Sequence, residues 1–261
     1  MKLQKFCDKM EVIAPKELAL SFDNVGLLIG PDHDEIKKVL VALDLTIQVA
    51  QEAIDGGYDL VLTHHPIFWD PVKSISPDCA ETAAAYLLIR HGIGHFAAHT
   101  NLDACTGGVN DVLAELLSLE NVQPLPPENL GRIGTLPAPV SFGSFASFCE
   151  EKLLTRARFV GNMNQIVRTV AVIGGSGGSD VEAVLLAGCD AFVTGEMKHS
   201  QALLAEHLGL CSCVMGHYET EFPVLKPLIS RLQRDENDVQ YDLTHTGCAP
   251  LRSLLGGSRY E

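Results

Sequence analysis

The sequence has 261 residues and a formal net charge of −14, and 46% of its residues are hydrophobic. This length allows one large domain or two modest ones, and the apolar content is enough for a sizeable core. The negative charge argues against sequence-independent binding of nucleic acid, which needs Lys and Arg to neutralise phosphates. No apolar run approaches the ~20 residues of a membrane span, and residues 1–8 lack a signal-peptide core. We therefore expect a cytoplasmic protein that binds neither nucleic acid nor membranes.

The cysteines are scattered along the chain, and several fall inside apolar patterns. No CxxC pair occurs, and the nearest approach is Cys211 and Cys213. This distribution is typical of reduced, buried thiols and argues against a structural zinc site built on thiolates.

The first 30 residues are expected to form an amphipathic helix, a second short helical start within residues 1–19, and a turn that feeds a short strand. Asp23 and Asn24 lie in this turn, before Gly26. They are typical Asx-turn residues, and their position also makes them candidates for the rim of a site.

The pattern then predicts a strand–helix–strand unit that ends in two histidines. Residues 39–43 and 60–63 are short apolar runs, and residues 46–57 between them have helical spacing. His64 and His65 follow the second run directly, at the sheet edge where α/β proteins bind ligands.

Neighbouring side chains on an extended backbone point to opposite sides. One metal ion could therefore use both imidazoles only if the chain bends sharply, whereas two ions a few ångströms apart could take one each. The alternative is that one histidine is a hydrogen-bonded core residue and the other faces solvent.

An aromatic loop, residues 67–71, follows the histidines and contains Trp69, the only tryptophan. Such a loop either stacks a planar ligand or, more commonly, packs on its own protein. Residues 79–91 are then predicted to form a helix, 94–99 a strand, and 107–119 a region that includes another helix. Pro124 to Glu128, continued by Gly131 to Pro139, is rich in chain-breaking residues, so we place the boundary between two subdomains, 1–123 and 128–261, there.

The second half repeats the rhythm of the first. Residues 170–173 correspond to 40–43, and residues 191–196 correspond to 60–65. His217 and Glu221 follow the next strand four residues apart, as His99 and Asp103 do in the first half. This predicts an α/β fold with two similar subdomains, an internal duplication, with mixed and largely parallel sheets flanked by helices.

The duplication gathers potential ligands at two corresponding sheet edges. The first copy supplies His64, His65, His99 and Asp103, and the second supplies Glu196, Lys198, His199, His217 and Glu221. If the two edges face each other, these groups converge. Mixed imidazole and carboxylate ligation suits Zn²⁺, Mn²⁺ or Fe²⁺.

Five segments, taken in order, resemble the signature segments of one family: 21–27 (SFDNVGL), 63–66 (THHP), 99–103 (HTNLD), 170–175 (VAVIGG) and 216–221 (GHYETE). The sequence is similar to the NGG-interacting-factor-three-like family, the GTP cyclohydrolase I type 2 homologues, in its short form. The resemblance implies a dinuclear metal site in a cleft and a ring-shaped homohexamer. It places the metal ligands on His64, His65, Asp103, His217 and Glu221. Residues 194–199 resemble a further family motif that usually carries Asp where Glu196 stands.

The resemblance implies a metal-dependent hydrolase that acts on GTP or on a related nucleotide or cyclic amide. With GTP, water would add to C8 of guanine, and loss of formate would leave dihydroneopterin triphosphate. His199 and Glu196 are the expected proton-transfer residues, and His99 is expected to hydrogen-bond a ligand rather than to bind metal. The alternative is a non-enzymatic metal-binding protein, such as a carrier or a scaffold.

Overall fold

The computed structural model describes residues 1–234, 238–247 and 249–251 and divides into two compact units. The first unit consists of Met1–Cys105 and the described part of Leu225–Cys248. The second consists of Thr106–Val224 and the described part of Ala249–Glu261. The sequence placed its subdomains at 1–123 and 128–261, so the two divisions differ at α5 (Val109–Leu116), α10 (Leu225–Gln233) and the strand after α10.

The first unit is built on a five-stranded sheet in the order β1-β4-β3-β2-β11. The β1–β4 pair is antiparallel and the others are parallel. The strands are β1 (Gly26–Ile29), β2 (Lys38–Ala42), β3 (Leu60–Thr63), β4 (Gly94–Ala97) and β11 (Gln240–Leu243). The three inner strands β2, β3 and β4 are almost wholly buried, which explains their uninterrupted apolar sequences.

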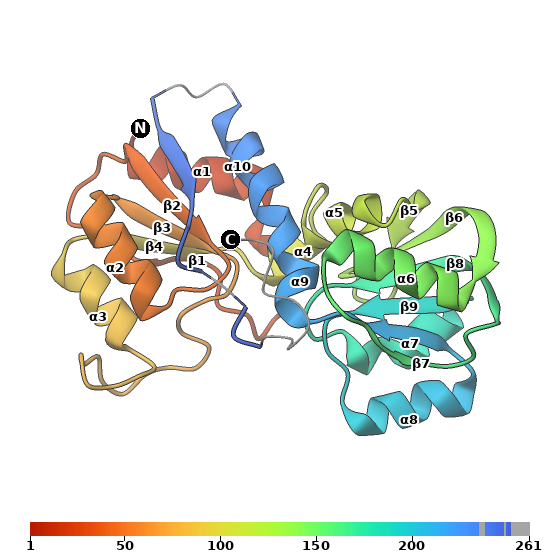
Figure 1. Cartoon of the computed structure of the whole chain (residues 1–261). Coiled ribbons are helices and arrows are strands. Elements are labelled where there is room, and N and C mark those ends of the chain that lie inside the picture. Colours follow the sequence, from red (N-terminus) through yellow and green to blue (C-terminus); the bar gives the residue numbers. More distant parts are fainter. Residues whose placement is uncertain (235–237, 248, 252–261) are drawn as a thin grey trace. The chain divides into compact units, whose positions relative to one another are not determined.

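Helices cover both faces of this sheet (Figure 1). The helices α2 (Ile47–Gly56) and α3 (Ala83–Arg90) share one apolar cluster with strand residues such as Leu40 and Val61. On the other face, α1 (Leu3–Ile13) packs Phe6 edge-on against Phe96, and α10 lies beside α1. Two short helical segments, η1 (Lys16–Leu18) and α4 (Thr100–Ala104), complete the unit.

The second unit has a six-stranded sheet in the order β5-β6-β8-β9-β10-β7. The neighbours β8, β9 and β10 are parallel, and the remaining pairs are antiparallel. The strands are β5 (Glu120–Pro124), β6 (Arg132–Ser141), β7 (Arg158–Val160), β8 (Ile166–Ile173), β9 (Ala191–Thr194) and β10 (Cys211–Val214).

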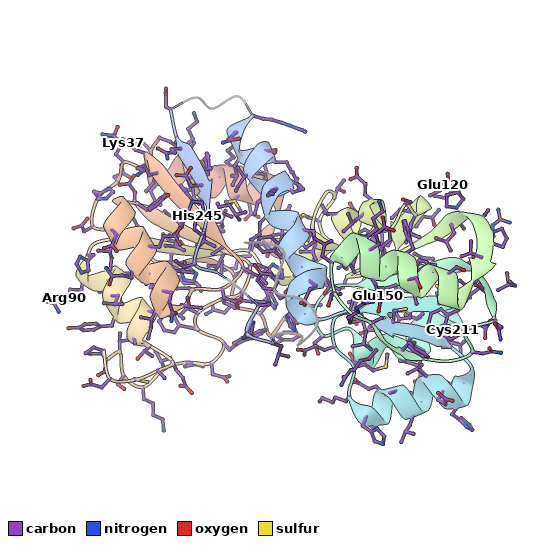
Figure 2. The ribbon with its side chains drawn as sticks, viewed as in Figure 1. Lys37, Arg90, Glu120, Glu150, Cys211 and His245 are labelled. Carbon is purple, nitrogen blue, oxygen red and sulfur yellow. The ribbon has the colours of Figure 1, made fainter. Side chains whose placement is uncertain are left out.

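The helices α5 and α6 (Phe142–Leu153) pack on one face of this sheet, around Phe142 and Phe145. The helices α7 (Val181–Leu186) and α8 (His199–Leu208) pack on the other face, around Phe192. Shorter segments are η2 (Gly178–Asp180), α9 (His217–Glu221) and η3 (Phe222–Val224). Charged side chains such as Lys37, Arg90 and Glu120 are exposed on the outside of their own units (Figure 2).

The strand orders confirm the predicted duplication. The order β1-β4-β3-β2 in the first unit repeats as β7-β10-β9-β8 in the second, with the same antiparallel edge strand and the same parallel core. The helices α1 and α6 precede the two edge strands in the same way. Both units are therefore mixed α/β structures flanked by helices, as the sequence predicted. The sheet of the first unit is largely parallel, whereas the second has two parallel and three antiparallel strand pairs.

The sequence analysis assigned the break in composition between the subdomains to a Pro-rich stretch and its continuation, residues 131–139. They belong mostly to β6, a strand of ten residues. The β6–β8 register shifts between Thr135 and Val140, and residues 137–139 are exposed. Prolines at an irregularity of this kind cost no ladder hydrogen bond, so Pro137 and Pro139 do not interrupt the strand.

Two further features agree with the sequence analysis. The seven cysteines in the described part of the chain are free thiols. Among the described residues, none of the helices combines the length and the apolar character that a membrane-spanning segment requires.

Candidate metal centre

The chain bends immediately after β3, and this bend brings two histidine rings together. The Thr63 hydroxyl donates to the carbonyl of His65 at 2.6 Å, and the amide of His65 donates to the carbonyl of Leu43 at 3.0 Å. The ring centroids of His64 and His65 are 4.9 Å apart. The extended backbone, which would point neighbouring side chains to opposite sides, thus ends at Thr63. The bend that follows is the kind that one metal ion would need in order to bind both imidazoles.

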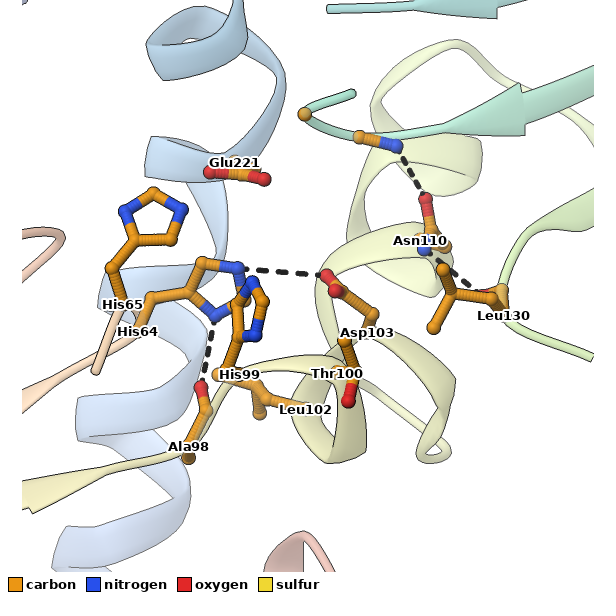
Figure 3. Close-up of polar contacts among 12 residues, drawn as sticks. His64, His65, Ala98, His99, Thr100, Leu102, Asp103, Asn110, Leu130 and Glu221 are labelled. Atoms are coloured by element: carbon orange, nitrogen blue, oxygen red, sulfur yellow. Dashed lines mark hydrogen bonds and ion pairs between the residues drawn. The ribbon is translucent and has the colours of Figure 1, made fainter. Parts of the chain in front are cut away.

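His64 is buried, and its tautomer is fixed by a backbone acceptor (Figure 3). Its Nδ1 is 2.9 Å from the carbonyl oxygen of Ala98. A carbonyl oxygen can only accept, so Nδ1 carries the proton and Nε2 carries the lone pair. Nε2 is 3.6 Å from Oδ1 of Asp103, a buried carboxylate on α4. His64 therefore presents a ligand nitrogen beside a carboxylate.

His65 is oriented in the same way by Asp44, the residue two positions after β2. Its Nδ1 is 2.8 Å from Oδ1 of Asp44, so Nε2 is the ring nitrogen that could coordinate a metal. A carboxylate on the far nitrogen is the usual support of a metal-binding histidine, because it fixes the ring and raises its basicity. The sequence analysis did not name Asp44, although its position at the end of a neighbouring parallel strand was a signal that could have identified it.

His99 joins the same cluster. Ligand atoms of His64, His65 and His99 all lie within 4.8 Å of one another. The Nδ1 of His99 is 3.0 Å from Asp23, which also accepts hydrogen bonds from the amide and hydroxyl of Thr100. Burial alone would raise the pKa of Asp23, but the hydrogen bonds from His99 and Thr100 outweigh it and lower the pKa to about 2. Asp23 is thus an ionised anchor for His99. Its carboxylate also accepts the amide N–H of the next residue, Asn24, and not the N–H two positions on that the predicted Asx turn would use.

The second unit presents its own pair of candidate ligands on α9. The Nε2 of His217 is 3.2 Å from Oε1 of Glu221, one helical turn later, and Nδ1 is 3.4 Å from Oε1 of Glu196. Glu221 is buried, whereas Glu196 is exposed. Gly175 makes room for this pair, because a Cβ there would lie 2.1 Å from Oε1 of Glu221.

The glycine-rich loop that contains Gly175 is held by its own unit. Its amides donate to acceptors within that unit: Gly174 to Asn110, Gly175 to Thr220, Gly177 to Thr194 and Gly178 to the carbonyl of Glu196. This use of the amides leaves little of the loop's backbone to bind a phosphate. The loop, residues 174–178 (GGSGG), also lacks the lysine that a Walker phosphate-binding loop carries. The loop instead supports the segment that carries His217 and Glu221.

The strand registers refine the relation between the two copies. They pair Thr63 with Ala97 in one sheet and Thr194 with Val214 in the other, so His99 corresponds to Gly216 rather than to His217. The two His-x-x-x-acid pairs are therefore offset by one residue, which rotates a helical side chain by ~100°. The positions of His64 and His65 are taken by Gly195 and Glu196 in the second copy.

The predicted catalytic pair is placed differently from the ligands. Glu196 approaches His217, as described above, whereas His199 is an exposed residue at the start of α8. Sequence reasoning placed both residues just beyond the strand end that corresponds to His64 and His65, and the structure agrees on that position along the chain. The role of His199 in proton transfer stays a prediction.

The ligands within each unit fit a divalent transition metal. The first unit offers three imidazoles and the Asp103 carboxylate, and the second offers an imidazole and a carboxylate. Nitrogen ligands mixed with carboxylate oxygens suit Zn²⁺, Mn²⁺ or Fe²⁺ rather than Ca²⁺, which prefers oxygen alone. The residues therefore fit a metal, and the number and identity of the ions are matters for experiment.

Known proteins resemble this chain over most of its length. The family described as Duf34/NIF3 (NGG1p interacting factor 3) matches residues 1–249. A GTP cyclohydrolase 1 type 2 homolog of Methanocaldococcus jannaschii is 36% identical over 236 residues, which are 87% of this chain and 92% of the relative. A protein of the same description from Clostridium perfringens is 31% identical over 262 residues, which are 97% of this chain and 100% of the relative.

Two solved structures have folds similar to that of this chain. A hypothetical protein of Staphylococcus aureus has a TM-score of 0.89 and 28% identity, with 97% of this chain and 99% of that one covered. The reduced form of a protein named HcgD from Methanocaldococcus jannaschii has a TM-score of 0.82 and 33% identity, with 93% and 97% covered. From the family match over residues 1–249 and these relatives, the chain belongs to the Duf34/NIF3 (NGG1p interacting factor 3) family.

Proposed function

We propose that this protein is a metal-dependent hydrolase that holds two divalent ions, Zn²⁺, Mn²⁺ or Fe²⁺, through five ligands. The proposed ligands are His64, His65, Asp103, His217 and Glu221. The observation that carries the proposal is the orientation of His64 and His65. Both direct Nδ1 at fixed acceptors, Ala98 and Asp44, so Nε2 is the nitrogen oriented for coordination.

The substrate proposed is GTP, or a related nucleotide or cyclic amide. Support comes from the relatives described as GTP cyclohydrolase 1 type 2 homologs. With GTP, two water molecules would open the imidazole ring of guanine and release formate. Rearrangement of the ribose and ring closure with loss of one water would then form dihydroneopterin triphosphate. Bound ions would supply Lewis acidity and lower the pKa of a water molecule.

The remaining chemistry belongs to the side chains. Ala98 and Asp44 hold the rings of His64 and His65, and the carboxylate of Glu196 lies 3.4 Å from Nδ1 of His217. We assign Glu196 and His199 to proton transfer, because both are exposed and follow the end of β9.

A non-enzymatic metal carrier or scaffold is the second candidate. It is favoured by the glycine-rich loop, whose amides are used within the unit and offer little to a nucleotide phosphate. Both candidates use the same ligands, so turnover separates them.

The test begins with elemental analysis of purified protein, for which we expect two metal ions per chain. The double variant His64→Ala/Glu221→Ala should lose most of this metal, whereas His207→Ala, at an exposed histidine on α8, should retain it. Metal-loaded protein is then screened with nucleotides and small cyclic amides. Unchanged metal content in the double variant would reject the ligand set, and metal binding without any turnover would favour the carrier.

We also propose a homohexamer of cytoplasmic location, on the strength of the family resemblance. Light scattering on the purified protein should give a particle of six chains. A monomer would reject this assembly without affecting the ligand assignment.

A further inference from the structure

A row of aromatic rings leads away from the histidine cluster to the surface of the first unit. The rings of His64 and His65 lie 5.0 and 5.4 Å from that of His99. Trp69 meets His99 edge-on at 5.0 Å, and Phe22 stacks at 6.4 Å from Trp69 with an interplanar angle of 25°. The two outermost members of the row are thus large apolar rings next to the candidate ligands.

Both outer rings are exposed, although their loops are firmly held. Phe22 is 64% and Trp69 is 51% exposed, whereas the neighbouring Phe68 packs against the core of the unit. The side-chain amide of Asn24 donates to the carbonyl of Phe68 at 2.7 Å and so joins the two loops. The loop therefore buries one aromatic ring as an anchor and presents the next one to solvent in a fixed place.

The exposed face of Trp69 borders a cavity of about 340 Å³. Its walls also include Phe68, Pro71 and Val72, which are apolar, and Asn24 and Asp70, which are polar. This volume is at the lower end of the range for small-molecule sites, so the cavity suits a ring system rather than a whole nucleotide. A carboxylate at the wall accepts hydrogen bonds from ring N–H or amino groups.

We propose that Trp69, supported by Phe22, is the stacking platform for a planar bicyclic heteroaromatic ring with N–H donors at its edge, of the purine or pteridine class. The ring would lie in the cavity against Trp69, with Asp70 accepting from its donors, beside the His99 end of the candidate metal ligands. The role of this platform in turnover rests on the proposed function, but the binding of the ring to Trp69 can be measured without any reaction.

The experiment uses the full chain after metal removal with a chelator, and guanosine as the probe. Trp69 is the only tryptophan, so the quenching of intrinsic tryptophan fluorescence reports on this ring alone. We expect saturable quenching by guanosine and none by ribose 5-phosphate, which has no aromatic ring.

Variants then test the platform by equilibrium dialysis, which does not depend on the tryptophan signal. Trp69→Leu should weaken guanosine binding about 10-fold or more, the size expected for the loss of one base–aromatic stack. Trp69→Phe should restore much of it. Phe159→Leu, at an equally exposed aromatic residue of the second unit, should leave it unchanged.

The inference would be overturned by the absence of saturable quenching, by unchanged guanosine binding in Trp69→Leu, or by a change of particle size in that variant. The last result would make the platform a contact between subunits. Failure of the proposed function looks different, because guanosine would then bind and depend on Trp69 while the metal-loaded protein turns nothing over. Conversely, turnover with an unaltered KM in Trp69→Leu would keep the hydrolase and reject the platform.

Discussion

The side-chain carbonyl of Asn110 accepts the amide N–H of Gly174 at 2.8 Å, and the amide group of Asn110 donates to the carbonyl of Leu130 at 3.0 Å (Figure 3). Asn110 is buried, and its two partners lie on the half-buried residues Gly174 and Leu130, so both hydrogen bonds are partly shielded from water. Through this contact α5 holds the start of the glycine-rich loop, and that loop in turn leaves space for Glu221 at Gly175.

We expect Asn110→Leu to lower the free energy of unfolding by about 2 kcal/mol, because it removes the partner of a partly buried donor and of a partly buried acceptor. Urea denaturation measures the change. The control Gln4→Ala removes an exposed side-chain hydrogen bond to Asp8 and should cost less than about 0.5 kcal/mol. Equal losses in both variants would show that Asn110 does not anchor the loop.

Gly175→Ala should displace Glu221 and reduce the metal content. The residue has a φ of +62°, and a Cβ would lie 2.1 Å from the Glu221 carboxylate and 3.1 Å from Nε2 of His217. Gly188→Ala is a matched control, because its φ is +76° and a Cβ there meets nothing within 4 Å. Both variants carry the strain of a left-handed backbone, ~1 kcal/mol or more. Only Gly175→Ala should lose metal in elemental analysis, and metal loss in both would assign the effect to strain alone.

Asp44→Ala should weaken metal binding by roughly 10- to 100-fold, since a carboxylate that orients a metal-bound histidine has an effect of this size. Asp44 holds Nδ1 of His65 at 2.8 Å without belonging to the proposed ligands. Competition with a chromogenic chelator gives the affinity. Asp55→Ala, which removes a carboxylate from the exposed face of α2, is the control. An affinity equal to that of the unaltered protein would show that His65 needs no carboxylate support.

His95 should make the protein less stable as the pH falls. Burial lowers the pKa of His95 to about 3, and its Nε2 lies 2.8 Å from the Thr63 hydroxyl. An unfolded histidine titrates near ~6.5, so between about pH 6.5 and 3 the unfolded chain binds a proton that the folded protein excludes. Stability therefore falls as the pH is lowered through this window, by about 2 kcal/mol at pH 5 from this group.

The measurement compares urea denaturation at pH 7 and pH 5. The difference between the two pH values should be smaller in His95→Gln, whereas His207→Gln, at an exposed site, should keep the wild-type difference. An unaltered pH dependence in His95→Gln would show that the acid sensitivity comes from other groups.

His199→Ala separates metal binding from catalysis. Because His199 is exposed and is not among the proposed ligands, the variant should keep its metal. If His199 transfers a proton, turnover should fall by roughly 10²-fold or more. Elemental analysis and steady-state kinetics on the same preparation decide the matter. Loss of metal would show that the ligand set is incomplete, and unchanged turnover would remove His199 from the mechanism.

The sequence by itself determined the order of the elements and the place of the ligands along the chain. Short apolar runs produced β3 and β9, and the histidines after Thr63 could only stand at a sheet edge. The spacing of apolar residues is a local property of the chain, so it also predicted the helices that flank the strands. Comparison of the two halves of the sequence predicted the duplication. The sequence analysis interpreted Pro137 and Pro139 as part of the break between the subdomains. The irregularity that admits these prolines within β6 is set by its pairing with β8, which the sequence does not reveal.

Only the tertiary structure decided how the side chains meet. The bend after Thr63, the acceptors that fix His64 and His65, and the one-residue offset between His99 and His217 all depend on pairing between distant segments. The exposure of Trp69 has the same origin, because Asn24 holds its loop across more than 40 residues of sequence. Hydrogen bonds between residues far apart in the chain leave no periodic trace in the sequence, so the orientation of the candidate site came from the fold.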